Sequence, residues 1–199
     1  MDTGILALII ITAIRLFLPL SVFKWPLLGG LLAILGDISD VMTFETYGSG
    51  PLSDEYYHNY DKVFDIYYLF LEFLVARTWT DKLAKKTAQG LFIWRFAGFG
   101  LFELSTLLGH TVRPFFFLAP NIFENFYLAW LTIRKFKPEF VLTKKRLVII
   151  LLIVGIPKII QESIMHWLLP DKTWYFFRDC LFWWAYDTAD ECPLNNLFK

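Results

Sequence analysis

Six long apolar stretches alternate with short polar connections along this chain, and they limit its possible folds more than any other feature. They cover residues 4–23, 25–44, 61–79, 91–110, 115–131 and 147–169. A membrane-spanning helix needs about 20 mostly apolar residues, which is close to the length of each stretch. The chain is 56% hydrophobic and 19% aromatic, which is more apolar than an ordinary soluble domain. The sequence therefore predicts an all-α, polytopic protein of the cell membrane, with six transmembrane helices in the lipid bilayer.

The C-terminal part of the chain has a different character. Residues 173–186 read TWYFFRDCLFWWAY, which is too short and too charged to cross a bilayer. Aromatic residues mixed with charged ones are typical of a helix that lies in the membrane interface. We therefore expect a transmembrane domain over residues 1–170, and an aromatic interfacial helix with a polar tail over residues 171–199. The two cysteines, Cys180 and Cys192, lie in this part and either form a disulfide or stay as two thiols.

Lysine and arginine are distributed unevenly among the connections. The connections after the third and the fifth stretch are rich in both, whereas residues 45–60 contain neither. Basic connections stay on the cytoplasmic side of a membrane, and a six-span arrangement places these two connections on the same side. Both chain termini are therefore expected outside. The formal net charge is zero, which argues against nucleic acid as a partner.

Many charged and polar residues lie inside the apolar stretches. Such residues are costly in a membrane and usually face the interior of a helix bundle or a water-filled cavity. Because neighbouring spans run in opposite directions, most of them sort into one polar layer in one half of the bilayer. The residues that we expect to form or flank this site are Arg15, Asp37, Asp40, Asp61, Asp65, Arg95, Glu103, Asn121, Glu124, Asn125, Lys158, Gln161, Glu162 and His166.

Acids outnumber bases within the spans. Eight Asp and Glu residues face three fixed bases, which are Arg15, Arg95 and Lys158. Like charges in a low dielectric cannot all stay ionised without partners, so the layer needs protonated carboxyls, a bound cation or a water-filled cleft. Oxygen ligands of this kind suit a divalent cation such as Mg²⁺ or Mn²⁺ better than zinc. In a structural alternative, Arg15 and Arg95 pair with carboxylates and hold helices together.

Two proline-containing segments share a pattern, PNIFEN at residues 120–125 and PKIIQE at residues 157–162. Proline cannot donate a backbone hydrogen bond to the residue four positions earlier. Each segment is therefore expected to break its helix and to free a carbonyl beside the polar layer. Lys158 is then either an anion-binding group at this layer or the i,i+4 partner of Glu162.

Four aspartates on two neighbouring spans form a pair of motifs. Asp37 and Asp40 belong to DISD, and Asp61 and Asp65 belong to DKVFD at the start of the next span. This D-x-x-D … D-x-x-x-D arrangement resembles the CDP-alcohol phosphatidyltransferases, a family of membrane enzymes with six spans. The resemblance implies a divalent-cation site with Asp37, Asp40 and Asp61 as ligands. It also implies that Asp65 deprotonates the acceptor alcohol. It does not extend to the motif's glycine and Ala-Arg positions, which here are Val41, Phe44 and Glu45.

Three functions stay open at the level of sequence. The first is a divalent-metal-dependent enzyme, a phosphatidyltransferase-like transferase, acting on a lipid or a lipid-linked phosphate. The second is a cation- or proton-coupled membrane transporter, because broken helices beside polar groups are a feature of transporters. The third is a non-catalytic membrane subunit or scaffold. Neither the substrate nor the oligomeric state follows from the sequence.

Overall fold

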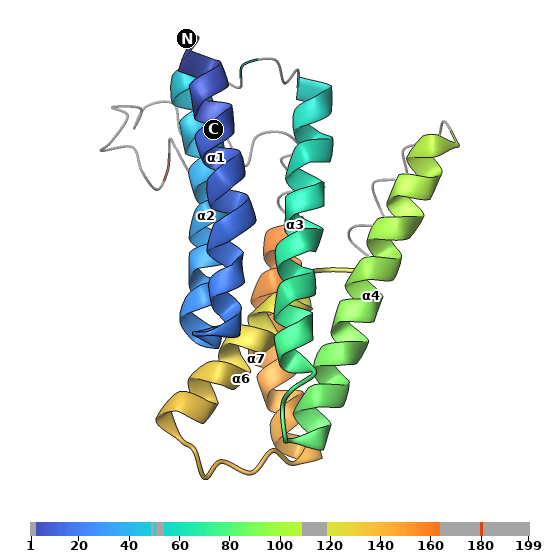
Figure 1. Cartoon of the computed structure of the whole chain (residues 1–199). Coiled ribbons are helices and arrows are strands. Elements are labelled where there is room, and N and C mark those ends of the chain that lie inside the picture. Colours follow the sequence, from blue (N-terminus) through green and yellow to red (C-terminus); the bar gives the residue numbers. More distant parts are fainter. Residues whose placement is uncertain (1–2, 49, 51–53, 109–118, 164–179, 181–199) are drawn as a thin grey trace. The chain divides into compact units, whose positions relative to one another are not determined.

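The computed structural model describes residues 3–48, 50, 54–108, 119–163 and 180 of this chain. All regular structure in these residues is helical, which confirms the all-α prediction (Figure 1). The elements are α1 (Thr3–Phe17), the 3-10 helix η1 (Leu18–Phe23), α2 (Pro26–Tyr47), α3 (Asp54–Ala76), α4 (Lys82–Leu107), α6 (Ile122–Phe136) and α7 (Lys144–Ser163). The predicted interfacial helix lies outside the described residues except for Cys180, which is disulfide-bonded.

The chain divides into two compact units. The first consists of Met1–Ala97 together with Asn121–Gly155, and the second of Gly98–Pro120 together with Ile156–Lys199. Helices α4 and α7 therefore contribute residues to both units. The aspartates of the two sequence motifs all belong to the first unit.

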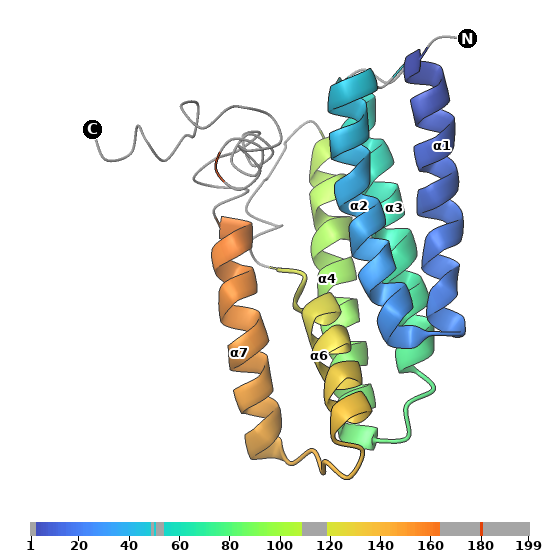
Figure 2. The same cartoon turned by 90° about the vertical axis from the view of Figure 1, so that its left-hand side faces the viewer.

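Helices α1, α2 and α3 lie side by side in the first unit (Figures 1 and 2). Gly29 lets α2 start directly against η1, since a Cβ at this position would lie 2.3 Å from the backbone nitrogen of Val22. The hydroxyls of Thr12 and Tyr60 are 3.1 Å apart and join α1 to α3. These contacts hold the three helices together around the C-terminal half of α1, and Arg15 lies in the last turn of this helix.

An aromatic core joins α3, α4 and α6 in the same unit. The rings of Phe73 and Phe92 stack with their centroids 4.3 Å apart, and Phe123 packs edge-on against Phe92 at 5.5 Å. Trp79 stacks on Tyr127 at 5.7 Å. Phe123 and Tyr127 are fully buried. Aromatic burial of this extent is a large stabilising contribution, and it sets the position of α6 against α3.

Within the part of the chain that the structure describes, two helical stretches are long and apolar enough to cross a membrane. They are Thr3–Phe23 and Pro26–Phe44, with mean hydropathies of 2.5 and 1.6. Only 28% and 33% of these windows are buried, and large apolar side chains such as Ile9, Phe17 and Leu35 are more than half exposed. The core helix of a soluble protein would instead be mostly buried. Both stretches are therefore suited to contact lipid, which supports a membrane location.

The connection predicted over residues 45–60 is shorter than expected. Helix α2 continues to Tyr47, and α3 already begins at Asp54. The polar composition of this segment favoured a loop, but polar residues are also compatible with the exposed end of a helix. Gly48 is the C-cap that follows α2, and its φ of +80° is a conformation that glycine adopts without strain.

The two prolines of the repeated pattern have different positions. The chain is not helical at residues 119–121, and α6 begins only at Ile122 with Asn121 as its N-cap. This interruption beside Pro120 agrees with the expected break, and the part of the apolar stretch before Ala119 lies outside the described residues. Pro157 was expected to break its helix, but α7 continues across it from Lys144 to Ser163, so this expectation was wrong. A proline removes one backbone hydrogen bond, and a helix can accommodate that loss by bending rather than ending.

Candidate functional site

The guanidinium of Arg15 lies at the centre of the four motif aspartates. Its Nη1 donates to Asp40 and, at 2.7 Å, to Asp61. Its Nη2 donates to Asp37 at 2.6 Å and to Asp65 at 2.9 Å. Each nitrogen thus bonds one aspartate of α2 and one of α3. We call Asp37, Asp40, Asp61 and Asp65 the aspartate cluster.

The local sequence explains why one arginine reaches four carboxylates. Asp37 and Asp40 are three residues apart on α2, and Asp61 and Asp65 are four apart on α3, so each pair lies on one helix face. Helix α1 packs against α2 and presents Arg15 to both faces. The guanidinium carbon of Arg15 also lies 5.4 Å from the ring centroid of Phe64. Arginine suits this position because its planar group carries several donors in a fixed geometry.

The cluster has a closed side and an open side. Asp40 is completely buried and Arg15 nearly so, whereas the side chains of Asp37, Asp61 and Asp65 are 36%, 33% and 30% exposed. Four carboxylates share one bonded guanidinium, so three negative charges are unbalanced within the cluster when all are ionised. The charge of Arg95 on α4 also acts on Asp65. The excess of acid predicted for this layer is therefore concentrated here.

Three of the aspartates are close enough to share one cation. A carboxylate oxygen from each of Asp37, Asp61 and Asp65 lies within 4.8 Å of the other two. Asp37 and Asp61 are two of the ligands that the motif resemblance implied. Asp65, for which the resemblance implied the role of base, completes this group, and Asp40 bonds Arg15 from the buried side.

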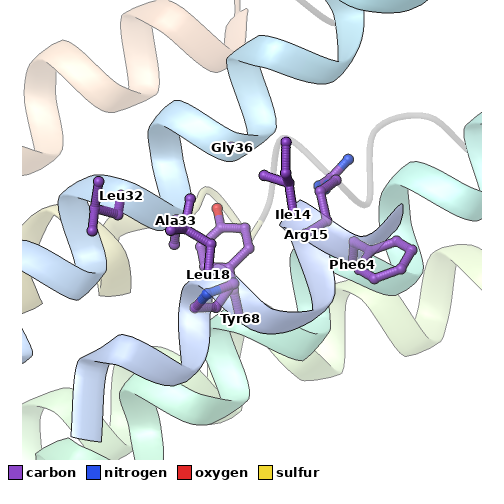
Figure 3. Close-up of a pocket in the computed structure, with 9 residues that line it drawn as sticks. Ile14, Arg15, Leu18, Leu32, Ala33, Gly36, Phe64 and Tyr68 are labelled. Carbon is purple, nitrogen blue, oxygen red and sulfur yellow. The ribbon is translucent and has the colours of Figure 1, made fainter. Parts of the chain in front are cut away.

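A narrow pocket lies beside the cluster, between α1, η1, α2 and α3. Arg15 and Tyr68 line it together with Gly36 and Phe64 (Figure 3). Its remaining lining is apolar, with Ile14, Leu18, Pro19, Leu32 and Ala33. The pocket therefore combines one cationic group and one phenol with an otherwise hydrocarbon surface.

The predicted polar residues of α6 make local contacts in the first unit. The Nδ2 of Asn121 donates to Glu124 Oε2 at 2.8 Å, and its Oδ1 accepts from the Glu124 backbone nitrogen at the helix start. Asn125 donates to the carbonyl of Val154 at 3.3 Å and so joins α6 to α7. These contacts give Asn121 and Asn125 structural roles in capping and helix packing.

The sequence prediction omitted Glu72 from the site, and the structure places it among the most buried residues of α3. Its side chain is fully buried, and neither carboxyl oxygen has a hydrogen-bond partner among the described residues. The charge of Glu124 acts on it from α6. Its spacing of seven residues from Asp65 was the available signal, because that spacing places both on one face of the helix.

The remaining predicted residues belong to the second unit. Lys158 and Glu162 form the i,i+4 ion pair expected as one alternative, with Nζ and Oε1 3.6 Å apart. Lys158 also lies 3.2 Å from Gln161 Oε1, and Glu103 is partly buried on α4. His166 lies outside the described residues. A single polar layer that joins these residues to the aspartate cluster stays a prediction.

Comparison with known proteins yields no relative for this chain: no family model, no curated protein and no solved structure matches it. The likeness to the CDP-alcohol phosphatidyltransferases is therefore limited to the two aspartate motifs. Function has to be inferred from the side chains and their surroundings.

Proposed function

We propose that the chain is a multi-pass membrane protein with six spans and with both termini outside. The exposed apolar surfaces of Thr3–Phe23 and Pro26–Phe44 support the first two spans. Basic residues are found where cytoplasmic ends are expected, in the last turn of α6 and the first residues of α7. The disulfide at Cys180 fits an oxidising compartment on the outer side.

We further propose that the aspartate cluster binds a divalent cation and that the protein is an enzyme acting on a lipid or lipid-linked phosphate. The observation that carries this proposal is the convergence of Asp37, Asp61 and Asp65 on the accessible side of the cluster. Three partly exposed carboxylates in a membrane helix bundle are expensive unless a cation or water compensates them.

The donor set fits a hard divalent cation. All three groups are carboxylates, which Mg²⁺ and Mn²⁺ prefer over nitrogen or sulfur ligands. Each carboxylate has a second oxygen besides the one that accepts from Arg15, so the arginine and an ion can share the same aspartates. Arg15 then acts as a positioning residue, because it holds the carboxylates of α2 and α3 at a fixed separation.

The chain's own residues have distinct roles in this proposal. When bound, the cation would neutralise the charge of a phosphate group. Asp65 would accept the proton of the attacking hydroxyl, the role that its motif position implies. Asp40 bonds Arg15 from the buried side and keeps the guanidinium directed at the other three aspartates.

A structural role is the second candidate, and the Arg15 hydrogen bonds favour it. One buried guanidinium that bonds two aspartates on each of two helices joins α1, α2 and α3 without any ion. A non-catalytic membrane subunit needs only this clamp. The two candidates differ in whether the purified protein binds a divalent cation.

Binding of Mn²⁺ to the purified full-length chain tests the proposal. The sharp electron paramagnetic resonance spectrum of free Mn²⁺ is expected to weaken as protein is added, and Mg²⁺ is expected to compete. Asp61→Asn removes one ligand charge and is expected to weaken binding at least tenfold. Asp81→Asn is the matched control, because Asp81 caps α4 through the nitrogens of Leu83 and Ala84 and asparagine caps a helix equally well.

Folded wild-type protein that leaves the Mn²⁺ spectrum unchanged at millimolar concentrations would contradict the enzyme proposal and favour the structural candidate. Equal Mn²⁺ affinity in the wild type and in Asp61→Asn would place any bound ion elsewhere. Thermal unfolding of both variants shows whether they keep the fold.

A further inference from the structure

Glu72 lies in the most enclosed part of the first unit. It is fully buried on α3, and both of its carboxyl oxygens lack a hydrogen-bond partner among the described residues. None of these residues forms an ion pair with it, whereas every aspartate of the cluster bonds Arg15. An ionised carboxylate without any such partner is among the costliest groups to bury.

The helices packed around Glu72 add negative charge and hydroxyls. Helix α6 contributes Glu124, whose charge acts on Glu72, and Tyr127, on which the charge of Glu72 acts in turn. Helix α3 contributes Tyr68 one turn earlier, and it experiences the charges of both glutamates. Helix α2 contributes Gly30. The charged neighbour is therefore an acid, which opposes ionisation of Glu72.

The packing at Gly30 leaves little space for a metal ion. A Cβ at Gly30 would lie 2.9 Å from Glu72 Oε1 and 3.2 Å from the Tyr127 ring. A proton neutralises a carboxylate without occupying additional volume, whereas a metal ion needs several ligands at coordination distance. A protonated carboxyl also provides an O–H donor, and the nearby Glu124 offers carboxylate acceptors.

We propose that Glu72 is a proton-binding site inside the helical unit, separate from the aspartate cluster. A hydronium ion of the solvent transfers its proton to one carboxyl oxygen of Glu72: one O–H bond of the hydronium breaks and leaves water, and one O–H bond forms on the carboxyl group. Glu124 is the neighbouring acid that favours this protonation, and Gly30 closes the site on the side of α2. The proposal does not depend on cation binding by the aspartates.

Infrared spectroscopy of the full-length protein, reconstituted in lipid vesicles at neutral pH, tests this site. A protonated buried carboxyl has a carbonyl stretching band that carboxylates lack. Wild-type protein is expected to show this band, and Glu72→Gln is expected to lose a component worth one carboxyl group. In Glu124→Gln the Glu72 component is expected to stay but to shift, because a neighbouring charge has been removed.

Glu139→Gln is the control, since Glu139 is exposed and its substitution should leave the band unchanged. Absence of the band from the wild type would overturn the proposal, and so would an undiminished band in Glu72→Gln. Failure of Glu72→Gln to fold would also overturn it, because a glutamine amide is nearly isosteric with a protonated carboxyl and equally uncharged. Mn²⁺ binding is a separate readout, so this proposal and the enzyme proposal can fail independently.

Discussion

Helix α3 carries two aspartates of the cluster as well as Glu72, yet the structure compensates these carboxyl groups in different ways. All four aspartates bond the guanidinium of Arg15, and three of them are about one-third exposed. Glu72 is fully buried and has an acid as its charged neighbour. Helix α3 therefore carries two aspartates that bond an arginine and, two turns further on, a glutamate that has no hydrogen-bond partner among the described residues.

The aspartate cluster and the Glu72 site are both acidic, but they differ in solvent exposure: the cluster is partly exposed, whereas Glu72 is fully buried. A divalent cation has to enter, lose part of its water shell and meet several oxygens, which the open side of the aspartate cluster permits. A proton needs neither space nor a set of ligands. This difference predicts that changes to Arg15 and changes around Glu72 have separate consequences for stability and for ion binding.

Substitution of Arg15 is expected to have the largest effect. Arg15→Ala leaves four carboxylates without their shared donor, and loss of one partner of a buried ion pair typically costs about 3–5 kcal/mol. Arg15→Lys keeps the charge but lacks the planar pair of nitrogens that bridges α2 and α3, so an intermediate loss is expected. Unfolding by denaturing detergent in mixed micelles measures both. Wild-type stability in Arg15→Ala would show that the aspartates are compensated without the arginine.

Substitution of Gly30 is expected to have a smaller effect, confined to the Glu72 site. In Gly30→Ala the new methyl group would approach Glu72 Oε1 and the Leu128 side chain to 2.9 Å, and such overpacking costs about 1–3 kcal/mol. The carboxyl band assigned to Glu72 should shift. Gly36→Ala is the matched control on the same helix, because its Cβ would meet only ordinary contacts at 3.7 Å. Equal stability of the two variants would show that Glu72 is not closely confined.

The helical class and the composition of the aspartate cluster could be predicted from the sequence, because both depend on local spacing. The separations within Asp37–Asp40 and Asp61–Asp65 place each pair on one helix face. That Arg15 bonds all four could not be predicted, because it depends on how α1, α2 and α3 are arranged in the folded unit. The sequence offered only the general expectation that Arg15 pairs with carboxylates.

The sequence pattern was less reliable at Pro157. A break was expected there, but α7 continues across this proline to Ser163. Glu72 forms no ion pair with a basic side chain of the described residues, and this could not be predicted because it depends on tertiary packing. Gly30 and residues of α6, not a lysine or an arginine, surround its carboxyl group. The spacing of acidic residues along a helix does not show whether their carboxyl groups lie next to an arginine, as Asp65 does, or next to another acid, as Glu72 does.

We propose that a divalent cation compensates the aspartate cluster and that a proton compensates Glu72. The infrared difference spectrum of the reconstituted full-length protein, with and without Mn²⁺, tests both parts together. We expect Mn²⁺ to change the carboxylate stretching bands in the wild type but not in Asp61→Asn, and to leave the carboxyl band that depends on Glu72 unchanged. Unaltered carboxylate bands, or loss of the Glu72 band on addition of Mn²⁺, would contradict the account.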